Sequence, residues 1–229
     1  FPLLDGVRAL AATLVFAFHT WIFLGLDLGR SLAHAIDELG IEATRDITTL
    51  TAHFGEAGVS LFYLLSAFLL YRPFAKHALA EGRKVELRGY AIRRLTRIVP
   101  AYWAVITIIG LTDPGTDPFT LRAFVDQYLF LGIWDPAGLA RSSNYYIPAW
   151  TIEVEMSFYL FLPIWATLLT ALRRRGGNAL RLELGGLVVL AAIAFVWKLV
   201  ALRGIHGNEW FGSSFAVLPA SLDVFAAGM

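Results

Sequence analysis

Long apolar stretches, separated from one another by charged segments, dominate the pattern of hydrophobic and polar positions in this 229-residue chain. Five of them reach about 20 residues, the length that an α-helix needs to cross the hydrocarbon core of a bilayer. They are 7–26, 54–74, 92–111, 147–169 and 182–202, and a sixth stretch begins near residue 215 and runs to Met229. The pattern therefore predicts an all-α, polytopic transmembrane helical bundle with about five full spans and part of a sixth.

A shorter apolar segment, 119–134, contains Arg122 and Asp126, which favours an interfacial or re-entrant helix over a further span. The charges of the intervening segments test this interpretation. Residues 72–97 and 173–181 are rich in Lys and Arg, whereas 27–56 and 112–146 carry more acidic than basic residues. Cytoplasmic loops of membrane proteins carry the excess of Lys and Arg. The two kinds of segment alternate correctly only if 119–134 does not cross, and they place the N-terminus in the cytoplasm.

Composition agrees with a membrane-embedded chain and narrows the classes of function. Hydrophobic residues make up 57% of the chain and charged residues 16%, too few charges to cover the surface of a soluble domain of this length. The net charge of +1 argues against nucleic acid as a partner, and the lack of cysteine excludes a thiol nucleophile and a disulfide framework. Because the chain begins with Phe1 and ends inside an apolar run, we expect a single transmembrane domain, 1–229, truncated at its C-terminal side.

Ionisable residues at membrane depth are the first candidates for chemistry, because such groups are costly there and usually face the bundle interior. Arg8 and His19 are eleven positions apart, which on a helix brings them within about 20° of one face and about 16 Å apart along the axis. Imidazole is the usual general base because it titrates near working pH. The alternative is that His19 hydrogen-bonds a neighbouring helix and Arg8 snorkels to the headgroups. Spacing alone leaves both alternatives open.

The fourth apolar stretch carries two carboxylates, Glu153 and Glu155. Their two-residue spacing turns them about 200° apart on a helix, so a mechanism that uses both in one cleft is poorly supported. Two roles stay open for this pair. One carboxylate orients His19, as the third group of a catalytic triad orients its base, or a protonated acid makes a helix-to-helix hydrogen bond.

Three arginines cluster where the third apolar stretch meets the cytoplasm. Arg97 follows Arg93 by four positions and Arg94 by three, so the spacing puts them on a shared helical face. Guanidinium groups suit phosphate oxygens, which fits an anionic cofactor. The alternative is a topology signal that also contacts anionic lipids. The sequence contains no Gly-rich phosphate loop, nucleophile elbow or His-Glu-x-x-His zinc pattern, and we expect no metal site.

Four motifs, in order along the chain, resemble the acyltransferase 3 family of membrane acyltransferases. They are Leu4-Asp5-Gly6-Val7-Arg8 with His19 after ten intervening residues, Gly58-Val59-Ser60-Leu61-Phe62-Tyr63-Leu64-Leu65-Ser66, Arg93-Arg94-x-x-Arg97 with Pro100, Tyr102 and Trp103, and Trp150-Thr151-Ile152-x-x-Glu155-x-x-Phe158-Tyr159. Each motif is weakly specific, but all four in this order and spacing, between residues 2 and 163, are a strong signal. The chain departs from the family pattern at Ala67, where glycine is usual, and at Met156, where a second acid is common.

The resemblance implies a helical bundle that moves an acyl group, often acetyl, from acyl-coenzyme A to a hydroxyl of a carbohydrate or lipid-linked acceptor. It implies that Arg8 and His19 form an essential pair and that the arginine motif faces acyl-CoA. It maps Glu155 onto the family's glutamate and leaves Glu153 as an extra acid. The expected site is therefore His19, Arg8 and Glu155 for catalysis, Arg93, Arg94 and Arg97 for the donor, and Ser66, Tyr102 and Trp150 for substrate, with no metal.

Two other classes of function stay open. A proton-coupled transporter or flippase of a lipid-linked or anionic substrate would use the intramembrane His and Glu residues as a proton relay, although the inverted repeats of transporters are not evident. A scaffold or sensor would use its buried charges only to pack helices. For the acyltransferase, the expected partners are acyl-CoA, the acceptor and membrane lipids, and the expected location is the cytoplasmic membrane of a bacterium. Transfer proceeds either directly or through an acyl-enzyme.

Overall fold

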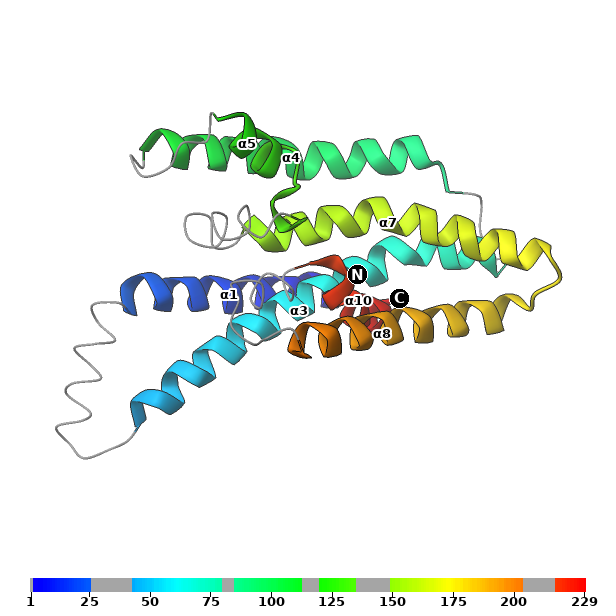
Figure 1. Ribbon diagram of the computed structural model, residues 1–229, viewed down its shortest axis with the longest axis horizontal. Helices are drawn as coiled ribbons and strands as arrows, with labels where there is room; N and C mark the ends of the chain where they lie inside the picture. Colours follow the sequence, from blue (N-terminus) through cyan, green and yellow to red (C-terminus); the bar gives the residue numbers. More distant parts are fainter. Residues whose placement is uncertain (1, 26–42, 80–84, 113–119, 135–148, 204–216) are drawn as a thin grey trace. The chain divides into compact units, whose positions relative to one another are not determined.

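A computed structural model describes residues 2–25, 43–79, 85–112, 120–134, 149–203 and 217–229 (Figure 1). Helices dominate these residues, and the described part of the chain contains no strand. The elements in chain order are α1 (Pro2–Gly25), α3 (Ala43–Ala78), α4 (Leu87–Thr112), α5 (Leu121–Ala123), the π-helical turn η1 (Phe124–Tyr128), the 3-10 turn η2 (Gly132–Trp134), α7 (Ala149–Arg174), α8 (Ala179–Arg203) and α10 (Leu218–Gly228).

Four of the described helical segments are long and apolar enough to cross a membrane. They are Ala57–Ala78 within α3, Leu87–Thr112, Ala149–Arg174 and Ala179–Arg203. They correspond to the second to fifth predicted stretches. The first predicted stretch, 7–26, falls on the 24-residue helix α1 as far as Gly25, which is not among these four, and residue 26 lies outside the described residues. The prediction of an all-α, polytopic membrane protein is thereby confirmed, whereas the cytoplasmic N-terminus stays a prediction.

The segment that was predicted not to cross is broken into the short elements α5, η1 and η2. Two hydrogen bonds end the π turn, from the Leu131 amide to the Asp126 carbonyl (3.0 Å) and from the Phe130 amide to the Gln127 carbonyl (3.4 Å). This pair of bonds is the Schellman motif, which places its penultimate residue in the left-handed region, usually as glycine. Here the residue is Phe130, with φ of 58°. Asp126 and Gln127 of this turn are buried, so the polar side chains of the irregular segment lie inside protein.

The chain divides into two compact units, residues 1–67 with 228, and residues 68–227 with 229. In the first unit, α1 packs closely against α3 at Gly58. A Cβ atom on Gly58 would lie 2.8 Å from Val15 Cγ2 and 3.1 Å from the Ala11 carbonyl oxygen. Small residues allow membrane helices to approach in this way, because packing rather than the hydrophobic effect drives helix association in lipid.

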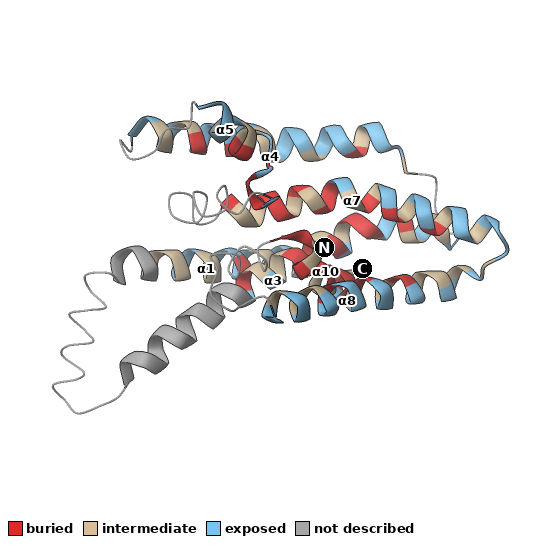
Figure 2. Cartoon of the chain, viewed as in Figure 1, coloured by how far each residue is buried: buried red, intermediate tan, exposed pale blue. Residues whose placement is uncertain are grey.

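In the second unit, α7 is the helix with the most extensive contacts, since it meets α4, η2 and α8. Buried residues recur along α7 from Ala149 to Leu169 (Figure 2). Phe158 of α7 stacks on Phe225 of α10, with ring centroids 3.9 Å apart. Gly186 of α8 leaves room for Trp165, whose ring a Cβ there would approach to 3.1 Å. The packing of the second unit therefore centres on α7, the helix that carries both glutamates.

Candidate functional site

His19 lies in the second half of α1, and its ring is held by its own helix. The Nδ1 atom is 2.7 Å from the carbonyl oxygen of Val15, one turn earlier. A carbonyl only accepts hydrogen bonds, so this contact places a proton on Nδ1, and the tautomer that it selects has its lone pair on Nε2. A general base needs such a lone pair in a fixed orientation. The geometry therefore fits His19 as a base that acts through Nε2.

Arg8, the expected partner of His19, belongs to the same uninterrupted helix. Both side chains are half-buried, and α1 is continuous across the ten residues between them. The helix thus carries a cation and an imidazole on nearly the same face, as their spacing predicts. Between them, Ala11 is completely buried and lies next to Gly58. One part of this helix therefore packs against α3, and the two polar groups lie on either side of that contact along the chain.

In the second unit, Arg94, Tyr159 and Glu155 form one connected group between α4 and α7. The guanidinium carbon of Arg94 lies 5.9 Å from the centroid of the Tyr159 ring, within the range of a cation–π contact. The Tyr159 hydroxyl donates a 2.5 Å hydrogen bond to Glu155 Oε1. Tyr90 of α4 donates to the Tyr159 carbonyl at 3.2 Å. Side-chain contacts therefore link the predicted donor-binding arginine to the predicted catalytic carboxylate.

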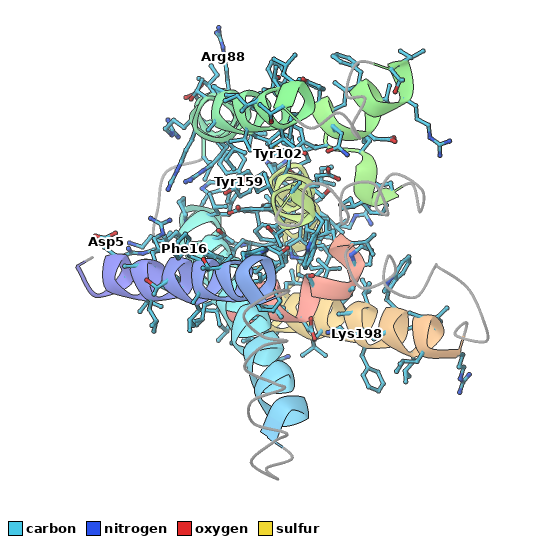
Figure 3. The ribbon with its side chains drawn as sticks, turned by 90° about the vertical axis from the view of Figure 1, so that its left-hand side faces the viewer. Asp5, Phe16, Arg88, Tyr102, Tyr159 and Lys198 are labelled. Atoms are coloured by element: carbon cyan, nitrogen blue, oxygen red, sulfur yellow. The ribbon has the colours of Figure 1, made fainter. Side chains whose placement is uncertain are left out.

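The arginines of α4 differ in exposure. Arg94 is half-buried, whereas Arg93 and Arg97 are exposed. Arg88, nearer the start of the helix than the motif, extends away from α7, while Tyr102 and Tyr159 lie between α4 and α7 (Figure 3). Of the three arginines in the motif, the structure therefore brings Arg94 to the Tyr159–Glu155 pair.

Glu153, the acid that the resemblance leaves over, is completely buried. Its Oε1 atom accepts a 3.2 Å hydrogen bond from the Tyr102 hydroxyl, and its Oε2 atom accepts one of 2.8 Å from the Ile133 amide. Tyr102 also stacks on Phe130, with centroids 4.6 Å apart. Tyr102, which we expected to contact substrate, is thus buried in a polar contact that joins α4, the turn η2 and α7. The sequence left open a helix-to-helix hydrogen bond for one of the two acids, but it did not indicate that Glu153 makes this bond or which residues are its partners.

The remaining predicted site residues are half-buried. Ser66 lies in α3, within the first unit, and Trp150 lies in the first turn of α7, within the second. The predicted site residues are thus divided between the two units, with Arg8, His19 and Ser66 in the first and Arg93, Arg94, Arg97, Tyr102, Trp150 and Glu155 in the second. No group of three or more possible metal ligands occurs among the residues that the structure describes.

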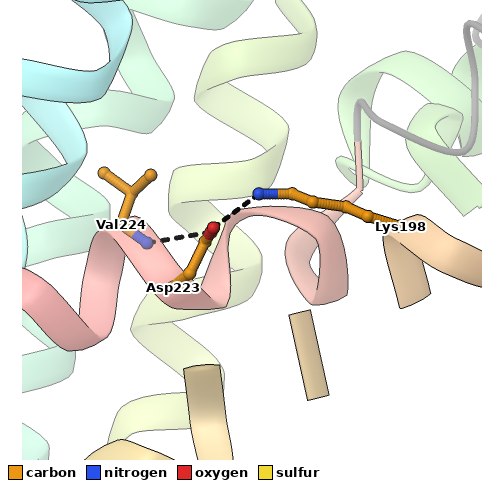
Figure 4. Close-up of polar contacts among 3 residues, drawn as sticks. All are labelled: Lys198, Asp223 and Val224. Carbon is orange, nitrogen blue, oxygen red and sulfur yellow. Dashed lines mark hydrogen bonds and ion pairs between the residues drawn. The ribbon is translucent and has the colours of Figure 1, made fainter. Parts of the chain in front are cut away.

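An ion pair between α8 and α10 was not predicted from the sequence. Lys198 Nζ lies 2.5 Å from Asp223 Oδ2, and Asp223 Oδ1 accepts a 3.0 Å hydrogen bond from the Val224 amide (Figure 4). The available signal was a lysine near the end of the fifth apolar stretch and an aspartate in the sixth. That signal indicates that a partner is needed at membrane depth, but it does not say which residue the partner is.

Comparison with known proteins finds a matching family model and several similar proteins that are named as acyltransferases. The model of a family described as an acyltransferase domain matches residues 1–229. The chain is 29% identical over 175 residues to acyltransferase MdmB of Streptomyces mycarofaciens, which covers 72% of this chain and 38% of that protein. It is 23% identical over 186 residues to a putative O-acetyltransferase of Staphylococcus aureus strain COL, covering 76% of this chain and 30% of that protein.

A further relative is the peptidoglycan O-acetyltransferase OatA of Listeria monocytogenes, 23% identical over 213 residues, or 87% of this chain and 29% of that protein. The matched regions therefore make up between 29% and 38% of the length of these relatives. No solved structure matches the chain.

Proposed function

The chain belongs to the acyltransferase 3 family, whose domain model matches it from residue 1 to residue 229, and we propose that it transfers an acyl group from acyl-CoA to a hydroxyl. The acyl group is most simply acetyl. The hydroxyl belongs to a carbohydrate or lipid-linked acceptor in the cell envelope of a bacterium. The observation that carries this proposal is the hydrogen bond from His19 Nδ1 to the Val15 carbonyl, which leaves Nε2 as a fixed base. The O-acetyltransferase names of two relatives support acetyl as the group transferred.

In the proposed reaction, His19 Nε2 removes the proton of the acceptor hydroxyl. The hydroxyl oxygen attacks the thioester carbonyl carbon, so that a C–O bond forms as the C–S bond breaks. The CoA thiolate leaves and takes up the proton from the imidazolium. A positioned general base contributes about 10²–10⁴-fold to such a step. Arg8 supplies a positive charge on the same helix, toward the end where we propose that the anionic donor enters.

On the donor side, Arg94 is the arginine that we assign to the CoA phosphates. Its guanidinium is held over Tyr159, and guanidinium groups bind phosphate oxygens through paired hydrogen bonds. The exposed Arg93 and Arg97 attract the anionic donor to this end of α4. Glu155, which accepts the hydrogen bond of the Tyr159 hydroxyl, is assigned to orienting a reacting group, as the third member of a triad does.

The test measures acyl transfer by the full-length protein in membranes supplied with radiolabelled acetyl-CoA. Because the base is lost, His19→Gln lowers transfer by about 100-fold or more while the protein accumulates normally in the membrane. Mass spectrometry of envelope glycans and lipids, from cells with and without the intact gene, identifies the acceptor by the mass of one acyl group. A His19→Gln protein with near wild-type transfer would contradict the proposal.

A further inference from the structure

We propose that Gly58 of α3 is a positioning residue for His19. It lets α3 lie directly against the turn of α1 that holds the histidine ring. The inference rests on the proposed function, in which His19 is the general base, and adds a residue on another helix that acts on the reaction only through His19.

The packing at Gly58 leaves no room for a side chain. A Cβ atom would lie 2.8 Å from Val15 Cγ2, and real Cβ atoms essentially never approach other atoms within 3.0 Å. It would also lie 3.1 Å from the Ala11 carbonyl oxygen and from Leu14 Cβ. None of the three atoms moves easily, because valine has one strongly preferred rotamer in a helix and the other two atoms move with the backbone. A methyl group at Gly58 therefore displaces α1.

Val15 connects this contact to the proposed chemistry. Its side chain lies closest to Gly58, and its carbonyl oxygen binds His19 Nδ1 at 2.7 Å. A shift of the Val15 turn by a few tenths of an ångström therefore moves the anchor of the imidazole. Because a misplacement of 1 Å can lower a rate by about 10²-fold, a shift of this size predicts a loss of roughly tenfold.

The chain supplies a matched control. Gly185 lies inside the apolar helix α8, and a Cβ atom there would meet nothing within 4 Å. Gly185→Ala therefore makes the same chemical change in a helix of the same kind without displacing a neighbour. It keeps the wild-type kcat, and Gly58→Ala does not.

The experiment uses the full-length protein in membranes and measures kcat and the KM for acetyl-CoA. Gly58→Ala lowers kcat about tenfold and leaves KM within about twofold, since the base and not donor binding is disturbed. The double variant Gly58→Ala/Val15→Ala removes the closest clashing atom, Val15 Cγ2, and recovers part of the lost kcat. If the Gly58→Ala protein does not accumulate in the membrane, the double variant must still accumulate there and transfer acetyl groups. A double variant that does not do so overturns the inference.

A spectroscopic measurement separates positioning from a general packing defect. In protein labelled with 15N-histidine, the His19 signal, identified by its loss in His19→Gln, has the proton on Nδ1 in the wild type. In Gly58→Ala a population with the proton on Nε2 appears. A wild-type kcat in Gly58→Ala, or a low kcat with an unchanged His19 signal, overturns the inference. An active His19→Gln protein instead overturns the proposed function, whatever Gly58→Ala does.

Discussion

Tyr102 of α4 and Glu153 of α7 meet inside the second unit, where the tyrosine hydroxyl donates a 3.2 Å hydrogen bond to a carboxylate oxygen that is fully buried. The second oxygen of Glu153 accepts the amide of Ile133. Both oxygens of this glutamate thus bind other elements of the fold, which gives the side chain a structural role beside the proposed site.

Removal of Glu153 destabilises the second unit. Glu153→Ala removes the carboxylate that accepts the hydrogen bonds of the Tyr102 hydroxyl and the Ile133 amide, which costs roughly 1–3 kcal/mol of unfolding free energy. Tyr102→Phe removes one hydrogen bond and keeps the stacking on Phe130, so it costs about 0.6 kcal/mol. Unfolding of the purified protein in detergent measures both variants. Equal losses, or a larger loss for Tyr102→Phe, would contradict this assignment.

Substitution of Arg94 weakens donor binding. Arg94→Ala removes the guanidinium beside Tyr159 and raises the KM for acetyl-CoA about tenfold, because charge-assisted hydrogen bonds to phosphate are lost. Arg88→Ala removes a cation from the same helix, on a side chain that extends away from α7 (Figure 3), and changes KM less than about twofold. Steady-state kinetics compare the two. An equal effect at Arg88 indicates attraction by overall charge instead of a bound phosphate.

The left-handed backbone conformation of Phe130 predicts an unusual order of stability for two variants with a shortened side chain at this position. Both Phe130→Ala and Phe130→Gly lose the stacking on Tyr102. Glycine adopts φ of 58° without a steric penalty, whereas alanine retains a cost of about 1 kcal/mol. The glycine variant is therefore the more stable of the two by about that amount, as unfolding midpoints in detergent can measure. The usual order, with alanine more stable, is the contrary result.

Lys198 and Asp223 predict a compensating pair of substitutions. Lys198→Met leaves Asp223 without its ion-pair partner, and Asp223→Asn does the same to Lys198. Each single variant is less stable than the wild type, and the double variant loses less unfolding free energy than the two single losses added together. The coupling free energy is about 1 kcal/mol, because both side chains are partly exposed to solvent. A double-mutant cycle in detergent unfolding measures this coupling. Additive losses would show that the pair contributes no net stability.

Several features followed from the sequence because they depend on local properties. A run of about 20 apolar residues predicts a spanning helix wherever it occurs, and α4, α7 and α8 confirm this. Motif spacing identified the family before any comparison. The boundaries were less well predicted, since α3 begins at Ala43 and not at residue 54. Helical hydrogen bonding continues into polar flanks that a hydropathy pattern does not include.

The histidine shows the division between sequence and structure most clearly. The sequence by itself determined that His19 shares a face with Arg8, because both lie on one helix of known pitch. Only the tertiary structure decided that Gly58 presses against the turn that holds the ring, and which partners Glu153 and Glu155 each bind. Such contacts depend on how neighbouring helices rotate and approach one another. That relationship is set by packing among residues far apart in the chain, which a one-dimensional pattern does not encode.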